Sequence, residues 1–173
     1  EDPRSRVGIP APLRPRRPVP GLISLGYSLA GTVIGVGEGV TDLRPGDRVA
    51  CSGSQCAHHA AIVAVPRNLT VPVPDAVPLE AAAFVTLGAI AEEALRRCAI
   101  SFGETVVLYG LGLLGLLAGQ IAAAAGYYVI GLDVDERRLA LARELGMTDV
   151  HDPSGIDVVE LVRSRTAGFG ADA

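Results

Sequence analysis

Three glycines at fixed spacing form the part of this sequence best suited to bind a ligand. They lie in the run Gly110-Leu111-Gly112-Leu113-Leu114-Gly115, directly after the apolar segment Val106–Tyr109 and at the start of a helix-forming segment. In a strand–glycine loop–helix unit, the first glycine makes the sharp turn and the second lets a phosphate approach the backbone. The third lets the helix pack closely on the strand, and the N–H groups at the helix start face the phosphates. The spacing therefore predicts that these six residues bind the pyrophosphate of a dinucleotide.

A carboxylate follows at the position where such units bind ribose. The apolar segment Tyr127–Leu132 ends at Asp133, 18 residues after Gly115. A carboxylate there accepts hydrogen bonds from both ribose hydroxyls of adenosine and repels a 2′-phosphate. We therefore expect NAD(H), held by Asp133 with Val134 and Arg138 beside it. The neighbouring Arg137 and Arg138 leave NADP(H) as the less favoured cofactor.

Other classes of protein use glycine loops of this kind. A methyltransferase that binds S-adenosylmethionine has a similar loop and ribose acid, and a non-catalytic module can bind a nucleotide without turnover. A glycine-rich turn without any ligand is the remaining alternative. The strand before the motif, the helix after it and the acidic residue at the expected distance favour the dinucleotide site.

Composition excludes several other mechanisms. All 15 basic residues are arginine, so a lysine Schiff base, a pyridoxal-phosphate site and the lysine of a P-loop are excluded. The net charge of −4 argues against nucleic-acid binding. The three cysteines lack the regular spacing of a disulfide-bonded scaffold. No signal peptide or membrane span is recognised. We therefore expect a cytoplasmic protein with neither nucleic-acid nor membrane partners.

The second half of the chain has the alternating pattern of an α/β fold. Strands are expected at 104–109, 127–132 and 149–151, and helices at 113–125, 135–145 and 156–165, the second of them capped by Asp135 and ended by Gly146. This order predicts a Rossmann-type doubly wound parallel sheet over residues 86–173. Only the first half of such a sheet is visible, so we expect the sequence to be part of a longer protein.

The first half has a different pattern. Residues 1–22 are rich in Pro and Arg and are expected to form a linker or arm. Residues 23–85 alternate short apolar runs with turns at 37–39 and 44–47, which predicts a small β domain, partly open, with strands at 30–36, 48–51, 59–65 and 69–73. One helix is expected over Leu79–Cys98.

A longer signature resembles a known family. The signature consists of the run Gly26–Val40 followed by Gly46-Asp47-Arg48-Val49, and the glycine loop comes later in the chain. Together they resemble the signature of the medium-chain dehydrogenase/reductase family, which includes zinc alcohol dehydrogenases and quinone reductases. The resemblance covers residues 24–173, and the Gly26-Tyr27-Ser28 version of the signature also looks like the dehydrogenase half of bacterial two-module oxidoreductases. It implies an incomplete GroES-like catalytic domain before a Rossmann domain, with hydride transfer in the cleft between them and a homodimer for the full-length protein.

The zinc ligands of that family are replaced in this sequence. Its zinc-binding members have Gly-His-Glu where this chain has Gly26-Tyr27-Ser28, and no zinc ligand stands near Phe84–Gly88. Cys51, Cys56, His58 and His59 form the alternative donor set. Zinc needs four ligands in a tetrahedron, whereas adjacent histidines on a strand point to opposite faces and Cys51 is expected in a strand as a small hydrophobe. We therefore expect no zinc, and expect Cys98 to lie in the core.

Without zinc, the chemistry needs proton donors or an activated acceptor. Non-zinc relatives reduce quinones or conjugated double bonds, so the resemblance implies a small carbonyl, quinone, enone or polyol substrate. Tyr27 occupies the former ligand position and is the candidate proton donor, with packing as its alternative role. Thr86 matches a helix position that touches the nicotinamide in relatives. The predicted protein is a zinc-independent NAD(H)-dependent oxidoreductase.

Overall fold

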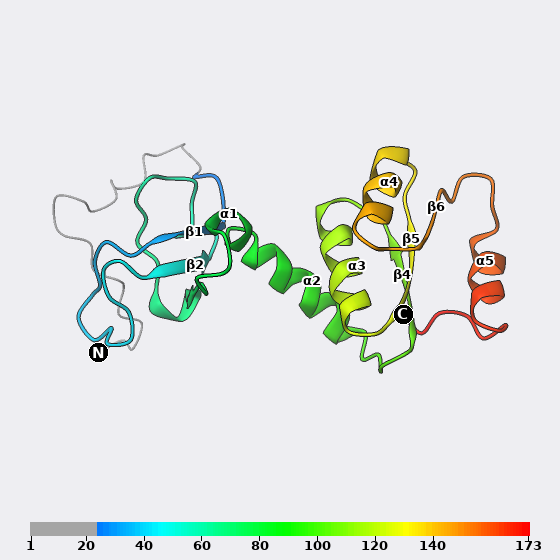
Figure 1. Cartoon of the computed structure of the whole chain (residues 1–173), viewed down its shortest axis with the longest axis horizontal. Helices are drawn as coiled ribbons and strands as arrows, with labels where there is room; N and C mark the ends of the chain where they lie inside the picture. Colours follow the sequence, from blue (N-terminus) through cyan, green and yellow to red (C-terminus); the bar gives the residue numbers. More distant parts are fainter. Residues whose placement is uncertain (1–23) are drawn as a thin grey trace. The chain divides into compact units, whose positions relative to one another are not determined.

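The computed structural model describes residues 24–173, and within these it forms two compact units divided between Thr86 and Leu87. The predicted linker at 1–22 lies outside the described residues. The first unit is β-rich and the second is a parallel α/β unit, as Figure 1 shows for each by itself. No helix within residues 24–173 is long and apolar enough to cross a membrane.

The first unit is built on a three-stranded antiparallel sheet. Its strands β1 (Ser28–Thr32), β2 (Arg48–Ser52) and β3 (Thr70–Pro72) lie in the order β1-β2-β3, with Ala30 opposite Ala50. A short 3₁₀ helix, η2 (Arg67–Leu69), precedes β3. Alternation along β2 sends Val49 and Cys51 into one apolar cluster and Ala50 into another that packs against helix α1 (Leu79–Ala82).

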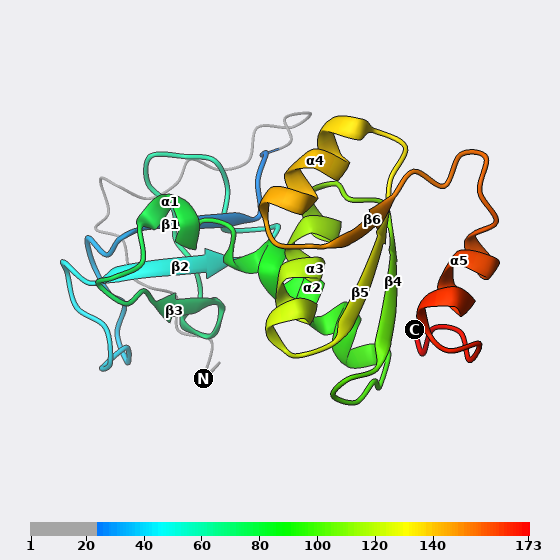
Figure 2. The same ribbon diagram turned by 45° about the vertical axis from the view of Figure 1, so that its right-hand side comes forward.

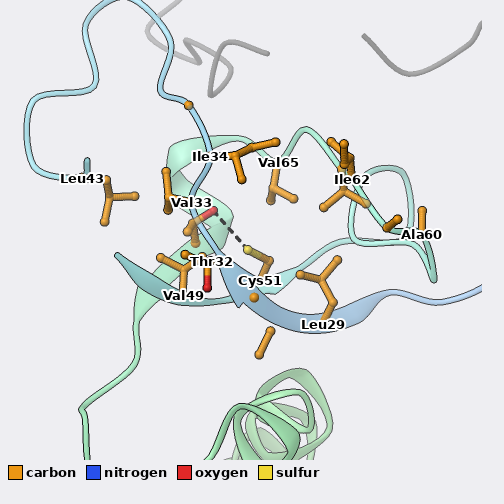
Figure 3. Close-up of a pocket in the computed structure, with 16 residues that line it drawn as sticks. Leu29, Thr32, Val33, Ile34, Leu43, Val49, Cys51, Ala60, Ile62 and Val65 are labelled. Atoms are coloured by element: carbon orange, nitrogen blue, oxygen red, sulfur yellow. Dashed lines mark hydrogen bonds between the residues drawn. The ribbon is translucent and has the colours of Figure 1, made fainter. Parts of the chain in front are cut away.

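The predicted strand at 59–65 is absent. Residues 60–65 instead follow an irregular path, and all of them except Ala64 line an apolar cavity of about 250 Å³ over the face of the sheet that carries Val49 and Cys51 (Figure 3). His59 begins this path, and its N–H donates to the carbonyl of Leu25 rather than to a strand neighbour. The apolar residues at 61–65 are therefore consistent with core packing as well as with a strand, and periodicity alone does not separate the two.

The predicted single helix over Leu79–Cys98 is wrong. The segment forms α1 and then α2 (Val85–Arg97), with Ala83 and Phe84 as a turn between them. The N–H of Phe84 donates to the carbonyl of Ala81, which closes a tighter turn than an α-helix has. The run lacks Gly or Pro at this point, so the sequence carries no helix-breaking residue to mark the turn.

The second unit has the predicted Rossmann-type topology. Strands β4 (Thr105–Tyr109), β5 (Tyr128–Leu132) and β6 (Asp149–His151) pair in parallel in the order β4-β5-β6. The N–H of Val107 in β4 also donates to the carbonyl of Ala173 at 2.8 Å. Helices α3 (Leu113–Ala124) and α4 (Glu136–Glu144) cover one face with the end of α2, and α5 (Val158–Arg165) covers the other (Figure 2). Within β5, Val129 faces the first layer while Ile130 and Leu132 face α5.

A polar cluster centred on the buried Asp149 joins β5, β6 and α5. The Asp149 carboxylate accepts hydrogen bonds from the Tyr128 hydroxyl at 2.5 Å and from Arg165 Nε at 3.1 Å, and it pairs with His151. Burial opposes ionisation of Asp149, but the hydrogen bonds from Tyr128 and His151 and the charge of Arg165 outweigh it and lower its pKa. The hydrogen bond to this carboxylate raises the pKa of Tyr128. The cluster therefore holds the last turn of α5 on the sheet.

Candidate functional site

The glycine loop leaves the start of α3 open to an anion. Gly110, with a φ of +92°, turns the chain at the end of β4, and its N–H donates to the carbonyl of Leu132 at 2.7 Å. Gly112 is the N-cap of α3, without a side-chain cap and without an acidic residue in the first turn. The free N–H groups of that turn therefore carry the positive end of the helix dipole with no internal partner from a cap.

Two of the glycines have different reasons to lack a side chain. A Cβ at Gly115 would lie 1.9 Å from the carbonyl oxygen of Gly110, so the close approach of α3 to the loop requires glycine. A Cβ at Gly112 would meet no atom of the protein within 4 Å. The chain itself therefore does not require glycine at 112, which is the position expected to face the pyrophosphate.

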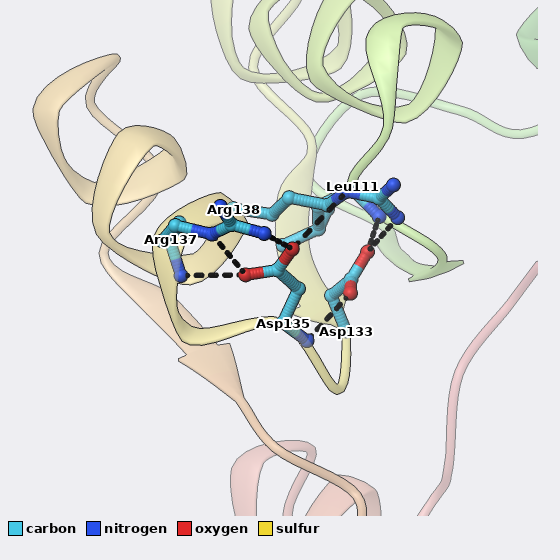
Figure 4. Close-up of polar contacts among 5 residues, drawn as sticks. All are labelled: Leu111, Asp133, Asp135, Arg137 and Arg138. Carbon is cyan, nitrogen blue, oxygen red and sulfur yellow. Dashed lines mark hydrogen bonds and ion pairs between the residues drawn. The ribbon is translucent and has the colours of Figure 1, made fainter.

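Asp133 ties the end of β5 to this loop. Its carboxylate is almost fully buried and accepts the N–H of Leu111 at 2.7 Å and the N–H of Asp135 at 2.9 Å (Figure 4). Arg138 Nη1 lies 3.3 Å from the oxygen that Leu111 also contacts. The bond from the Asp135 backbone, with those from Leu111 and Arg138, lowers the pKa of Asp133 despite its burial. The group is thus a carboxylate at neutral pH.

The two arginines beside it are both engaged with carboxylates. Arg137 contacts Asp135 at 3.1 Å, and Asp135 also caps α4 by accepting the N–H of Arg137. Arg138 lies between Asp133 and Asp135, at 3.3 and 4.0 Å. Val134 is 72% exposed at the same edge of the sheet. The structure thus brings Asp133, Val134 and Arg138 together beside the glycine loop.

An apolar groove lies against the other side of the loop, within the second unit. Its volume is about 510 Å³. Ile90, Ala91 and Ala94 of α2 line it opposite Leu113 and Leu114 of α3. The groove offers a nonpolar surface directly beside the N–H groups of the first turn of α3.

Tyr27 and Thr86 are brought together in the first unit. The backbone carbonyl of Tyr27 accepts the N–H of Gly53 at 2.9 Å and the Thr86 hydroxyl at 3.4 Å. The Ser28 hydroxyl donates to the carbonyl of Ala83 at 2.6 Å and accepts the N–H of Thr86 at 3.3 Å. The Tyr27 side chain is 43% exposed, and within residues 24–173 its hydroxyl has no hydrogen-bond partner.

The donor set considered for zinc does not converge. Within the described part of the chain, no three His, Cys, Asp or Glu side chains form a group that could hold a metal ion. Cys51 is buried with its Sγ 3.6 Å from Thr70 Oγ1, and burial raises the pKa of its thiol. Cys56 donates to backbone carbonyls, and Cys98 is exposed, so its predicted place in the core is wrong. Within residues 24–173, Cys51, Cys56, His58 and His59 do not form the tetrahedral set of ligands that zinc needs.

Two other residues beside Tyr27 have roles that the sequence analysis missed. Ser28 bridges β1 to the start of α2, and His58 Nδ1 lies 3.3 Å from the carbonyl of Gly26. The sequence pattern presents Ser28 only as a replaced ligand and His58 only as a metal donor. Ser28 belongs to the family signature itself, and this place is the sequence feature that could have pointed to it. No local pattern places His58 beside Gly26, because the two residues are 32 positions apart.

Two family models match the chain. The model described as the alcohol dehydrogenase GroES-like domain matches residues 6–130, and the model described as zinc-binding dehydrogenase matches residues 114–173. The two matches together run from the β-rich unit through the glycine loop to the last residue.

Similar proteins and structures include several oxidoreductases. A sorbitol dehydrogenase of Halalkalibacterium halodurans is 32% identical over 184 residues, covering 90% of this chain and 54% of that protein. The crystal structure of Escherichia coli quinone oxidoreductase complexed with NADPH matches with a TM-score of 0.72 and 29% identity, over 95% of this chain and 53% of that one. The CurK enoyl reductase structure matches with a TM-score of 0.75 and 25% identity, over 86% and 45%. The chain thus spans about half the length of these proteins.

Proposed function

Because this chain belongs to the medium-chain dehydrogenase/reductase superfamily, we propose that it forms part of a zinc-independent, NAD(H)-dependent oxidoreductase. The enzyme transfers a hydride to or from a small carbonyl, quinone, enone or polyol substrate. The nicotinamide supplies or accepts the hydride, while the residues of this chain bind the cofactor, orient the substrate and move a proton. Sorbitol dehydrogenase, quinone oxidoreductase and enoyl reductase among the similar proteins support a substrate from these classes.

The carboxylate of Asp133 carries the choice of NAD(H). It is charged, buried and anchored by two backbone N–H groups, so it stays at the end of β5 when a ligand binds. Its Oδ1 accepts one hydrogen bond within the protein, which leaves acceptor capacity for a ribose hydroxyl. A 2′-phosphate at the same place would meet a fixed negative charge.

Arg137 and Arg138 favour NADP(H) only weakly over NAD(H). Arg137 and Arg138 are the cations that a 2′-phosphate would need, and each is already paired with Asp135 or Asp133. A phosphate would have to compete with those carboxylates. The similar quinone oxidoreductase binds NADPH, so the choice between the cofactors has to be made on the residues of this chain.

The residues at positions 27 and 28 support zinc independence. A phenol and a hydroxyl stand where the family's metal-binding members have ligands, and the Ser28 hydroxyl is used to hold Ala83 and Thr86. We assign proton donation to the Tyr27 phenol, which is exposed and has no partner for its hydroxyl within residues 24–173. Thr86 is assigned a contact with the nicotinamide.

Titration of the full-length protein with NADH and NADPH, followed by nicotinamide fluorescence, tests the cofactor assignment. We expect NADH to bind at least about tenfold more tightly, and Asp133→Asn to reduce that preference to about threefold or less. Tighter binding of NADPH, or binding of neither below about 1 mM, contradicts the assignment. Binding of S-adenosylmethionine in place of NADH would favour a methyltransferase-like protein. NADH binding without oxidation by quinones, enones, ketones or sugar alcohols would favour a non-catalytic module.

The oligomeric state and the cellular compartment are also part of the proposed function. We propose a homodimer of the full-length chain that acts on a small molecule in the cytoplasm. The three cysteines are unpaired in the structure, which is the usual state in a reducing compartment. Sedimentation of the full-length protein tests the dimer.

A further inference from the structure

The backbone that carries Tyr27 is fixed by hydrogen bonds from the loop 53–59. The N–H of Gly53 donates to the carbonyl of Tyr27 at 2.9 Å, and the N–H of His59 donates to the carbonyl of Leu25 at 2.8 Å. Strand β1 begins at the next residue, and it pairs with β2. The main chain at residue 27 is therefore held on both sides.

The segment that carries Thr86 has no such neighbours of its own. Thr86 stands two residues after the turn at Ala83 and Phe84, which separates α1 from α2. The last carbonyls of one helix and the first N–H groups of the next have no partner within their helices. Ala83 is the C-cap of α1, and Thr86 is the second residue of α2, so each brings one such group to the turn.

The hydroxyl of Ser28 is the partner of both groups. It donates to the carbonyl of Ala83 at 2.6 Å and accepts the N–H of Thr86 at 3.3 Å. A hydroxyl donates and accepts at one oxygen atom, whereas a carboxylate only accepts and an amide uses two separate atoms. A serine on β1 thus ties the turn between α1 and α2 to the residue that follows Tyr27.

A third hydrogen bond closes a ring through these residues. The Thr86 hydroxyl donates to the carbonyl of Tyr27 at 3.4 Å, so Thr86 is attached to Tyr27 by its side chain and to Ser28 by its backbone. A distance of 3.4 Å between two oxygens is long for a hydrogen bond, and this contact alone holds Thr86 weakly. The place of Thr86 relative to Tyr27 therefore depends on Ser28.

We propose that Ser28 is a positioning residue, which holds Thr86 against Tyr27 so that the nicotinamide and the proton donor meet the same substrate atoms. The inference rests on the proposed function, in which Thr86 contacts the nicotinamide and the Tyr27 phenol donates the proton. When a carbonyl is reduced, the hydride of NADH adds to carbon, the C=O π bond breaks and the oxygen takes the phenolic proton. Water then returns a proton to the phenolate. A displacement of about 1 Å between reacting groups costs about 100-fold in rate.

The test separates kcat from NADH affinity in the full-length protein. NADH binding is measured by nicotinamide fluorescence, and NADH oxidation with whichever of benzoquinone, methyl vinyl ketone and acetoin the unaltered protein reduces. We expect Ser28→Ala to lower kcat by about 10- to 100-fold. Its Kd for NADH should stay within about threefold of normal, because the glycine loop and Asp133 are unaltered. Ser28→Thr keeps the hydroxyl and should retain kcat within about threefold.

Thr70→Val is the matched control for a general loss of stability. The Thr70 hydroxyl also bonds within the first unit, to the carbonyl of Pro66 at 3.2 Å and beside Cys51 Sγ at 3.6 Å. Valine removes these contacts and leaves the bonds of Ser28 in place. We expect Thr70→Val to keep kcat within about twofold. A loss of kcat as large as that of Ser28→Ala would show that destabilisation explains both, and would overturn the positioning role.

A variant without the Thr86 side chain tests the route of the effect. Because Ser28 acts through the place of Thr86, adding Ser28→Ala to Thr86→Ala should lower kcat by less than about threefold further. The full loss of Ser28→Ala in this background would mean that Ser28 acts independently of Thr86, and would contradict the proposal.

The remaining outcomes distinguish this inference from the function beneath it. Normal kcat in Ser28→Ala, or equal losses in Ser28→Ala and Ser28→Thr, overturns the positioning role alone. An unaltered protein that binds NADH and reduces none of the probes contradicts the proposed function, and the positioning role falls with it.

Discussion

The two glycines at the start of α3 allow stability and cofactor binding to be separated by single methyl groups. Gly112→Ala places a Cβ where no protein atom lies within 4 Å, whereas Gly115→Ala places one 1.9 Å from the carbonyl oxygen of Gly110. Both substitutions add the same atoms, three residues apart. Any difference between them therefore comes from what surrounds each position.

The structure sets the size of each effect. A carbon and a carbonyl oxygen in contact lie about 3.3 Å apart or more, so Gly115→Ala forces α3 and the loop to separate by more than about 1 Å. Overpacking of this kind costs about 1–3 kcal/mol. Gly112→Ala should cost less than about 1 kcal/mol, since only the N-cap preference of glycine over alanine is lost. In NADH binding, however, the methyl group added by Gly112→Ala would stand where the pyrophosphate approaches, and we expect at least about 100-fold weaker binding, or about 2.7 kcal/mol.

Urea unfolding followed by far-ultraviolet circular dichroism, together with NADH titration, measures both quantities on the same samples. Gly115→Ala should lose stability and affinity, and Gly112→Ala should lose affinity alone. NADH affinity within about threefold of normal in Gly112→Ala would refute the assignment of Gly112 to the cofactor. Equal unfolding free energies for the two variants would refute the close approach at Gly115.

Three further predictions concern the stability of each unit by itself. Ser28→Ala removes the hydrogen bonds from the Ser28 hydroxyl to Ala83 and Thr86 and should lower the free energy of unfolding of the first unit by about 1–2 kcal/mol. Ser28→Thr is the control that keeps a hydroxyl, and equal stability of the unaltered protein and both variants would contradict a role for these bonds. The lowered pKa of Asp149 means that its contribution is present above the ordinary value of 3.8 and is lost as the pH falls through the lower folded-state value. Asp149→Asn should therefore cost about 2 kcal/mol at neutral pH and flatten the fall in stability below pH 3.8, and an unchanged acid-unfolding curve would contradict this. Ala99 has a φ of +54°, which glycine adopts without strain, so Ala99→Gly should raise the free energy of unfolding by about 0.5–1 kcal/mol and with it the melting temperature. Gly103→Ala is the converse control, since Gly103 has a φ of +82° and should lose stability. A lower melting temperature for Ala99→Gly would contradict the prediction.

The second unit was predictable from the sequence because local signals and the fold agree there. Short apolar segments end at Gly110 and Asp133, and Asp135 caps its helix as its residue type predicts. A buried parallel strand reads as a continuous apolar run, and the connecting helices begin and end at recognisable residues. From β4 to α5 the strand and helix bounds consequently lie within two residues of the predicted ones, and those of β6 agree with them.

The first unit was less predictable because its decisive contacts join distant parts of the chain. At the turn of Ala83 and Phe84, the carbonyl of Ala83 accepts a hydrogen bond from the hydroxyl of Ser28, which lies 55 positions earlier in the chain. The position of His59 depends on carbonyls near Tyr27, and no local pattern contains them. Periodicity reports which residues are apolar, whereas these contacts depend on which loops fold back on β1.

Asp133 joins the two roles that sequence analysis treats separately. Its residue type and position assign it to the ribose, yet in the structure it also holds the N–H groups of Leu111 and Asp135, so the shape of the glycine loop depends on it. Replacing it with alanine would leave two N–H groups without their acceptor and would weaken binding of either cofactor. Because only one of its properties repels a 2′-phosphate, a change of cofactor preference requires a side chain at 133 that loses the charge and keeps the acceptor. Asparagine retains one acceptor oxygen, which is why Asp133→Asn tests cofactor preference more directly than removal of the side chain does.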